Sequence, residues 1–211
     1  LQTLGDSFLV NTDNTIGPQY EPKVAALSDG GYVIVWRDDN QDGNSTAVMG
    51  QRYAADSSKV GSAFQVNEYT VGGQYEPAVI GLSTGGFVVS FFNDNYGPDG
   101  TPNNVYLREY DAAGNPVDGD RLVNTYTTNN QQQPAMADLG QGNYVVVWRS
   151  EYQDGSNSGV YQQLFGDTAE LPRQANPEVA DFVGTVTFLE NAVNAGLQAQ
   201  IDPRELPQLA K

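Results

Sequence analysis

The feature that most constrains the fold is one segment that occurs three times. A glycine-containing turn leads into an apolar strand that ends in an aromatic residue, at residues 29–37, 84–92 and 141–149. Asn11, Asn67 and Asn124, which precede these segments, lie 56 and 57 residues apart. Periods near 50 residues are typical of propeller blades and similar arrays. The sequence therefore predicts a tandem array of one structural unit.

Other landmarks recur at matching places within each unit. A Gln-x-x-Pro motif starts at Gln19, Gln74 and Gln131, before the apolar segment. In the first unit, strands are predicted at residues 8–11, 23–27, 32–36 and 48–53. The third of these strands is apolar on both faces, which indicates a central strand covered on both sides.

We predict an all-β fold with three four-stranded antiparallel blade-like repeats, at about residues 8–63, 64–120 and 121–166. This β domain covers residues 1–166. Propellers typically have four to eight blades. A propeller-like fold would therefore be completed by oligomerisation or by further blades of a longer parent protein. A β-trefoil, which also has three four-stranded repeats, is the alternative.

The repeat contains Val-Asn, Gln-x-x-Pro, Leu-Ser-Asp-Gly-Gly-Tyr-Val-Ile-Val-Trp, Gln-Asp-Gly and Gly-Gln-Arg-Tyr. Over residues 8–166 it resembles a tandem repeat of large bacterial surface and secreted proteins, often accompanied by calcium-binding RTX-type modules. The resemblance implies blade-like sheets on an extracellular bacterial protein. Residues 167–211 are predicted to be a linker and C-terminal tail, with a strand at residues 185–189. Residues 184–202 resemble the start of a cadherin-like repeat from the same kind of protein.

Composition excludes several kinds of site and partner. The chain has 10 basic and 26 acidic residues, a net charge of −16, so nucleic acid is not expected as a partner. It has no cysteine and no histidine, which excludes disulfides, thiolate metal sites and the commonest general base. No apolar run approaches the roughly 18 residues that a membrane span requires.

Acidic side chains near the Asp-Gly pairs are candidate calcium ligands. Asp38, Asn40 and Asp42 place oxygen atoms at alternate positions before a glycine, as at the start of a calcium loop. The corresponding loops of the other repeats contribute Asp94, Asp99 and Asp154. RTX-type glycine–aspartate nonapeptides are absent from this sequence, so calcium does not follow from that motif. We favour the alternative, in which each Asp-Gly forms a turn and its carboxylate caps backbone amides.

Two pairs of an aromatic residue and an arginine, Trp36-Arg37 and Trp148-Arg149, are candidate glycan-binding residues. The second repeat has Phe91-Phe92 at this position. This substitution favours the alternative that the aromatic side chains fill space between repeats.

The leading functional hypothesis is a non-enzymatic extracellular module for adhesion, matrix formation or self-assembly. Its candidate partners are glycans, further copies of the chain or further blades of a longer parent protein, and calcium is the candidate metal. The alternative is a carbohydrate-active enzyme or its carbohydrate-binding module. In such an enzyme, Glu21 and Glu76 would form a carboxylate pair of the kind that glycosidases use.

Overall fold

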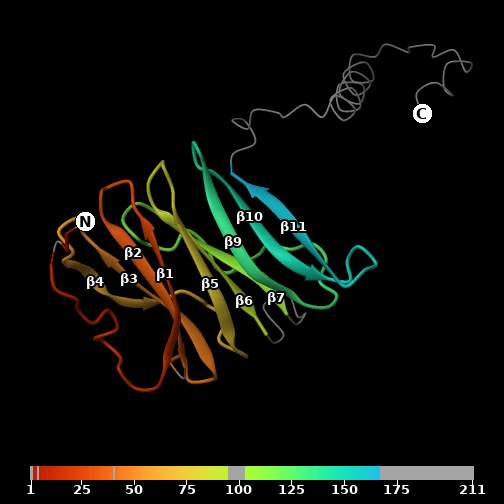
Figure 1. The fold of residues 1–211 in the computed structure, drawn as a ribbon, viewed down its shortest axis with the longest axis horizontal. Coiled ribbons are helices and arrows are strands. Elements are labelled where there is room, and N and C mark those ends of the chain that lie inside the picture. Colours follow the sequence, from red (N-terminus) through yellow and green to blue (C-terminus); the bar gives the residue numbers. More distant parts are fainter. Residues whose placement is uncertain (1, 4, 40, 95–102, 167–211) are drawn as a thin grey trace, which may run out of the picture. The chain divides into compact units, whose positions relative to one another are not determined.

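The computed structural model describes residues 2–3, 5–39, 41–94 and 103–166. The chain divides into two units, Leu1–Glu170 and Leu171–Lys211, and all described residues belong to the first. The predicted linker and tail at residues 167–211 lie outside the described residues. Within the described residues the protein is all-β, with antiparallel strands and no helix (Figure 1).

Three sheets follow one another along the chain, and each is an antiparallel meander. The first sheet contains β1 (Gln19–Ala26), β2 (Tyr32–Asp39), β3 (Thr46–Tyr53) and β4 (Lys59–Gln65). The second contains β5 (Gln74–Gly81), β6 (Phe87–Asn93), β7 (Asn104–Tyr110) and β8 (Arg121–Leu122). The third contains β9 (Gln131–Gly140), β10 (Asn143–Glu151) and β11 (Ser158–Phe165).

The all-β prediction is confirmed, and so are antiparallel sheets of about four strands. The strands form three separate meanders rather than the single barrel of a β-trefoil. All three sheets are open, and the described residues do not close a propeller ring. Among the described residues, the third sheet has three strands rather than the predicted four.

The repeated apolar segments form the central strands β2, β6 and β10, as predicted. In the first sheet a tight turn joins β1 to β2. There the Gly31 carbonyl accepts a hydrogen bond from the Leu27 N–H, and Gly30 has a φ of 84°. This left-handed conformation favours glycine and explains the recurrence of glycine before the central strand.

The strand predicted at residues 8–11 is wrong. These residues form no strand, and their repeat equivalents belong to the sheet before them. Phe64 pairs with Gly50 of β3, and Arg121 pairs with Leu107 of β7. Each repeat therefore begins with the segment that completes the preceding sheet.

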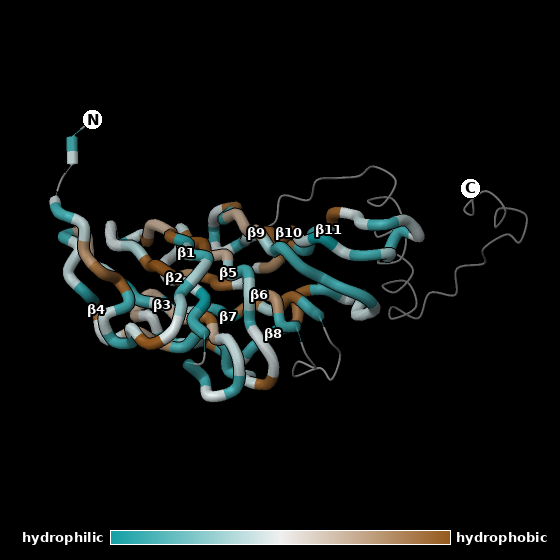
Figure 2. The backbone as a smooth tube through the Cα atoms, turned by 60° about the horizontal axis from the view of Figure 1, so that its bottom comes forward, coloured by the Kyte–Doolittle hydropathy of each residue, from teal (hydrophilic) through white to brown (hydrophobic). Residues whose placement is uncertain are grey.

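The three sheets stack through apolar side chains, with the second sheet between the other two. Figure 2 shows hydrophobic stretches along the strands of all three sheets. We call the side of a sheet that is turned to the next sheet in sequence its forward face, and the opposite side its rear face. The forward face of the first sheet packs against the rear face of the second through Val33, Val35, Val48, Phe87 and Phe91. The second and third sheets pack in the same way through Val88, Val105, Leu107, Tyr144 and Trp148.

Candidate functional site

The Gln-x-x-Pro motif forms a bulge at the same place in every sheet. The residue before each proline has a positive φ of 52–57°, at Glu21, Glu76 and Gln133. The register of β1 with β2 shifts at this point, and so does that of β5 with β6. A bulge re-aims the side chains of the bulged strand, and here it turns a side chain toward the next sheet.

The bulges are connected by hydrogen bonds between sheets. Glu21 Oε2 accepts a hydrogen bond from the N–H of Glu76 at 2.7 Å. Glu76 Oε2 in turn accepts one from the N–H of Gln133, also at 2.7 Å. These two glutamates are the residues of the carboxylate pair that the enzyme hypothesis requires. In the structure each has a hydrogen-bonding role between sheets.

Two asparagines fix the segments that complete the first two sheets. We call residues 64–67 and 121–124 the closing segments. The N–H of Val48 donates to Asn67 Oδ1, and the N–H of Val105 donates to Asn124 Oδ1, both at 2.9 Å. Both asparagines are buried, and each anchors its segment to the third strand of its sheet, β3 or β7.

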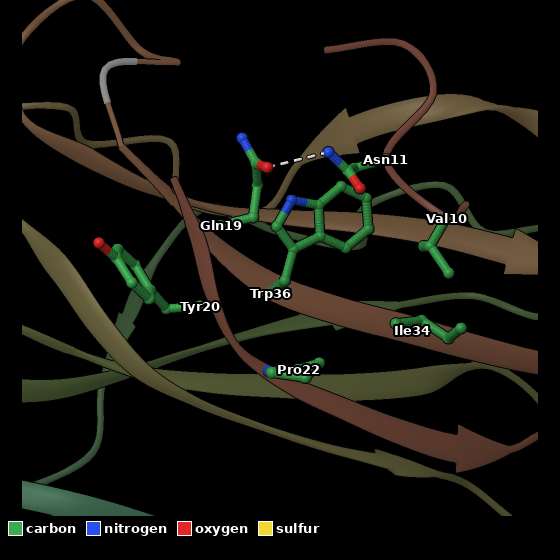
Figure 3. A pocket seen from close by; sticks show the side chains of 7 residues that line it. All are labelled: Val10, Asn11, Gln19, Tyr20, Pro22, Ile34 and Trp36. Atoms are coloured by element: carbon green, nitrogen blue, oxygen red, sulfur yellow. Dashed lines mark hydrogen bonds between the residues drawn. The ribbon is translucent and has the colours of Figure 1, made fainter. Parts of the chain in front are cut away.

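A pocket of about 200 Å³ lies on the rear face of the first sheet (Figure 3). Trp36 lies at its centre, and its indole N–H donates to Asp38 Oδ2 at 3.2 Å. Its other lining residues are Val10, Asn11, Gln19, Tyr20, Pro22 and Ile34. Phe91 occupies the position of Trp36 in the second sheet, and there the first sheet covers it. The pocket therefore occupies a place that sheet stacking fills elsewhere.

The four predicted glycan-binding residues are not brought together. Arg37 lies against the rings of Tyr20 and Tyr75, at 5.0 and 4.5 Å from their centroids, and pairs with Asp39 at 3.1 Å. Trp148 is buried between the second and third sheets, and its indole N–H donates to Gln131 Oε1 at 3.1 Å.

Arg149 pairs with Glu151 at 2.9 Å. Of the four predicted residues, Trp36 alone lines the pocket. Gln19 and Pro22, which belong to the first Gln-x-x-Pro motif, also line the pocket, and the Trp-Arg pairs did not predict them.

Most of the predicted calcium ligands accept hydrogen bonds from other groups of the protein. Asp38 is buried beside Trp36, and loss of hydration raises the pKa of its carboxyl, which hydrogen bonds from Trp36 and Gln19 partly offset. Asp42 Oδ1 accepts the N–H groups of Asn44 and Ser45 at 3.0 and 3.3 Å.

Asp94 and Asp154 similarly accept the N–H groups of Gly73 and Ser156. Asn40 and Asp99 lie outside the described residues. Within the described part of the chain, no group of three or more acidic side chains could hold a metal ion. Calcium binding stays a prediction.

The two ends of the stack expose faces that are buried inside it. Val160 of β11 occupies the position of Val48 in β3, because their partners on the central strands are Arg149 and Arg37. Val160 is 83% exposed, whereas Val48 and its equivalent Val105 are both fully buried. Leu164 lies on the same forward face of the third sheet and is 43% exposed.

On the rear face of the first sheet, Val24 is 65% exposed. Its equivalent in the second sheet, Val79, packs into the core. Each end of the stack thus presents the type of face that the other end lacks.

Comparisons with known proteins identify no family. No family model matches the chain, and no curated protein does. A solved structure of a protein of unknown function from Dyadobacter fermentans is similar in fold, with a TM-score of 0.50 and 13% identity over 71% of this chain. This chain covers 51% of that protein.

Two further solved structures match with lower scores. An endo-arabinase from Bacteroides thetaiotaomicron has a TM-score of 0.44 and 13% identity, over 76% of this chain and 62% of its own. A Hadza microbial sialidase has a TM-score of 0.33 and 9% identity, over 69% of this chain and 44% of its own. The chain thus spans less than two thirds of the length of each of these proteins. Among the described residues, no helix is long and apolar enough to cross a membrane.

Proposed function

We propose that this chain is a non-enzymatic assembly module of an extracellular bacterial surface or secreted protein. It associates end to end, the forward face of the third sheet of one copy packing against the rear face of the first sheet of another. The observation that carries this proposal is the exposure of Val160, whose equivalents Val48 and Val105 are fully buried. Exposed apolar faces of this kind mark sites of protein association.

The faces at the two ends are complementary in kind. Inside the stack, valines of a forward face pack against aromatic residues of the next rear face. The third sheet offers Val145, Val147 and Val160 on its forward face, and the first sheet offers Val24 and Ile34 on its rear face. End-to-end contact between copies would repeat the packing that holds each copy together.

A charge on the exposed forward face tests the proposal. Val160→Asp is expected to leave the fold intact, because the side chain is 83% exposed, but to abolish association. Ser156→Asp adds the same charge in the turn between β10 and β11 and is expected to associate like the unaltered chain. Sedimentation equilibrium would measure the mass of all three proteins. A monomeric unaltered chain at high concentration would refute end-to-end association, and equal association of Val160→Asp would refute the packing of these two faces.

Glycan binding at the Trp36 pocket is a second candidate function. The Trp36 indole, which is 5% exposed, and the side-chain amides of Asn11 and Gln19 line the pocket, and such groups contact sugar rings and hydroxyls. A glycan array probed with the unaltered chain and with Trp36→Ala would test this function. Binding that requires Trp36 supports it, whereas no bound glycan, or the same glycans bound by both proteins, counts against it.

A further inference from the structure

We propose that residues 8–11 of one copy add to the outer edge of β11 in a second copy, as the missing fourth strand of the third sheet. This inference rests on the proposed end-to-end association and specifies the contact. The outer edge of β11 pairs with no described residue. An unpaired strand edge is a template for a strand from another chain.

The sequence of residues 8–11 is that of a closing segment. Phe8-Leu9-Val10-Asn11 corresponds to residues 64–67 and 121–124, and all three end in Val-Asn. In the first two sheets this Val-Asn begins 13 residues after Tyr53 and Tyr110. After Phe165, the same distance leads to Glu178 followed by valine. The sequence that follows β11 thus lacks this pattern.

Residues 8–11 already lie where a closing segment lies. The ring of Phe8 packs against Tyr53, with ring centroids 5.6 Å apart. The equivalent Phe64 packs against Tyr110 in the same tilted way, at 5.3 Å. Val10 joins the cluster of Trp36 on the rear face of the first sheet. The segment is therefore held on the face that meets the next copy.

Within the described residues of one copy, Asn11 makes the hydrogen bonds in which its equivalent Asn67 donates, but not the one in which Asn67 accepts. Its amide donates to the Asn14 carbonyl at 2.9 Å and to Gln19 Oε1 at 3.0 Å. The amide of Asn67 donates to the equivalent pair, the Tyr69 carbonyl and Gln74 Oε1. Asn67 Oδ1 also accepts a strand N–H, whereas no described residue donates to Asn11 Oδ1. This free acceptor fits the outer edge of β11.

Two existing sheets predict the same register. In the first sheet Phe64 pairs with Gly50, and in the second Arg121 pairs with Leu107. Phe8 is equivalent to the first residue of each pair, and Gln162 is equivalent to the second. Both pairs therefore place Phe8 opposite Gln162 of the partner copy.

The main-chain bonds follow from the same comparison. The carbonyls of Val48 and Val105 accept the N–H groups of Val66 and Val123, at 2.7 and 2.9 Å. In the third sheet, the carbonyl of Val160 would accept the N–H of Val10. The N–H of Val160 would donate to Asn11 Oδ1.

The bulges agree with this order of copies. Glu21 accepts from the N–H of Glu76, and Glu76 accepts from that of Gln133, so acceptors point toward the next sheet. The side chain of Gln133 would then accept from the N–H of Glu21 in the copy that donates its closing segment. The second sheet separates the first from the third within one copy, so the donor is a second chain.

Engineered cysteines test this register, because the chain has no cysteine of its own. Phe8→Cys and Gln162→Cys are prepared as separate proteins, mixed and mildly oxidised. We expect a disulfide between the two variants. Gln163→Cys is the matched control, because its side chain leaves the strand on the opposite face and disulfides require converging Cβ atoms. Peptide mapping would identify the linked positions.

The outcomes separate this inference from the proposed function. If the unaltered chain associates and Val160→Asp does not, but position 8 links no better to position 162 than to 163, strand addition is wrong and face packing stands. If the specific disulfide forms while Val160→Asp associates normally, face packing is wrong and strand addition stands.

Asn11 provides a second measurement. Asn11→Ala is expected to weaken association about tenfold or more, because the N–H of Val160 loses its acceptor. Asn11→Asp keeps an acceptor oxygen and is expected to restore much of the affinity. Equal association of Asn11→Ala and the unaltered chain would overturn the predicted contact.

Discussion

The carboxylates of Glu21 and Glu76 show how a single residue joins neighbouring sheets. Each side chain accepts a backbone N–H of the next bulge, and each residue has a positive φ. Non-glycine residues rarely adopt this conformation and persist in it where surrounding contacts hold them. The bond between sheets is one such contact.

Removal of this acceptor should destabilise the domain. Glu76→Ala leaves the N–H of Gln133 without its acceptor, and we expect a loss of about 1–3 kcal/mol in the free energy of unfolding. Glu76→Gln keeps an acceptor oxygen and should lose less. Urea unfolding would measure both variants. Equal losses would show that the carboxylate charge, rather than the hydrogen bond, matters at this position.

Asp120 should make the stability of the domain depend on pH. Its side chain is 2% exposed, and it accepts the N–H groups of Glu68 and Tyr69, both at 2.9 Å. Loss of hydration raises the pKa of its carboxyl above the ordinary value, although the two N–H groups and Arg108 oppose this effect. A raised pKa in the folded state means that folding favours the protonated form.

The sign of the effect can be tested with Asp120→Asn. The charge of Asp120 opposes folding above its raised pKa, and this penalty disappears below the ordinary value of about 3.9. The stability of Asp120→Asn relative to the unaltered chain should therefore be most favourable at neutral pH and decline toward pH 4. Urea unfolding across this range would measure the difference. A pH-independent difference would contradict the prediction.

At the scale of elements, the closing segments decide where a sheet ends. β8 contains only two residues, yet the main-chain bond of Val123 and the side chain of Asn124 continue its contact with β7. A short outer strand held by an asparagine side chain limits the exposed edge of the sheet. The third sheet lacks this cover in the described part of the chain.

Asn124→Ala should therefore loosen the second sheet. The N–H of Val105 loses its acceptor, and we expect destabilisation of about 1–3 kcal/mol. Hydrogen exchange should show faster exchange at Val105 and in β8 than in the central strand β6. Asn11→Ala is the matched control, because in one copy Oδ1 of Asn11 accepts from no described residue. A larger loss of monomer stability for Asn11→Ala would contradict this account.

The sequence predicted the central strands and turns but not which sheet each closing segment completes. Apolar runs such as Val33–Trp36 and the glycines before them carry local signals for a buried strand after a tight turn. The periodicity of a tandem repeat, however, is the same wherever the unit boundary is drawn. Pairing of Phe64 with Gly50 rather than within its own repeat depends on the hairpin that joins β3 to β4, which periodicity does not reveal.

The candidate site was predicted in part. Trp36 was identified from its position at the end of an apolar strand, and it lines the pocket. Trp148 has the same sequence context and the same 5% exposure as Trp36, but it lies between two sheets. Sequence context cannot separate them, because the difference lies in whether another sheet covers the rear face.

At the scale of the whole molecule, the stack has two unlike ends. Such head-to-tail contacts form closed rings if the rotation closes and open filaments if it does not. Two copies would supply six sheets, which lies within the range of four to eight blades in propellers. A mass that stops at two chains as concentration rises would indicate a ring.

Salt should strengthen this association. The net charge of −16 makes copies repel one another, and salt screens this repulsion. Between about 0.01 M and 1 M salt the Debye length falls from about 30 Å to about 3 Å. We expect the dissociation constant, measured by sedimentation, to fall across this range. A rise with salt would indicate that ion pairs rather than apolar faces hold the copies together.

The sequence by itself determined the repeat, the central strands, the turns and the exclusion of cysteine and histidine chemistry. These features depend on local patterns and composition, which are read residue by residue. The tertiary structure decided which segments complete which sheets, which tryptophan lies between two sheets, and that Glu21 and Glu76 bridge sheets. Those outcomes depend on contacts between residues about one repeat apart, and similar repeats acquire different surroundings at the two ends of a stack.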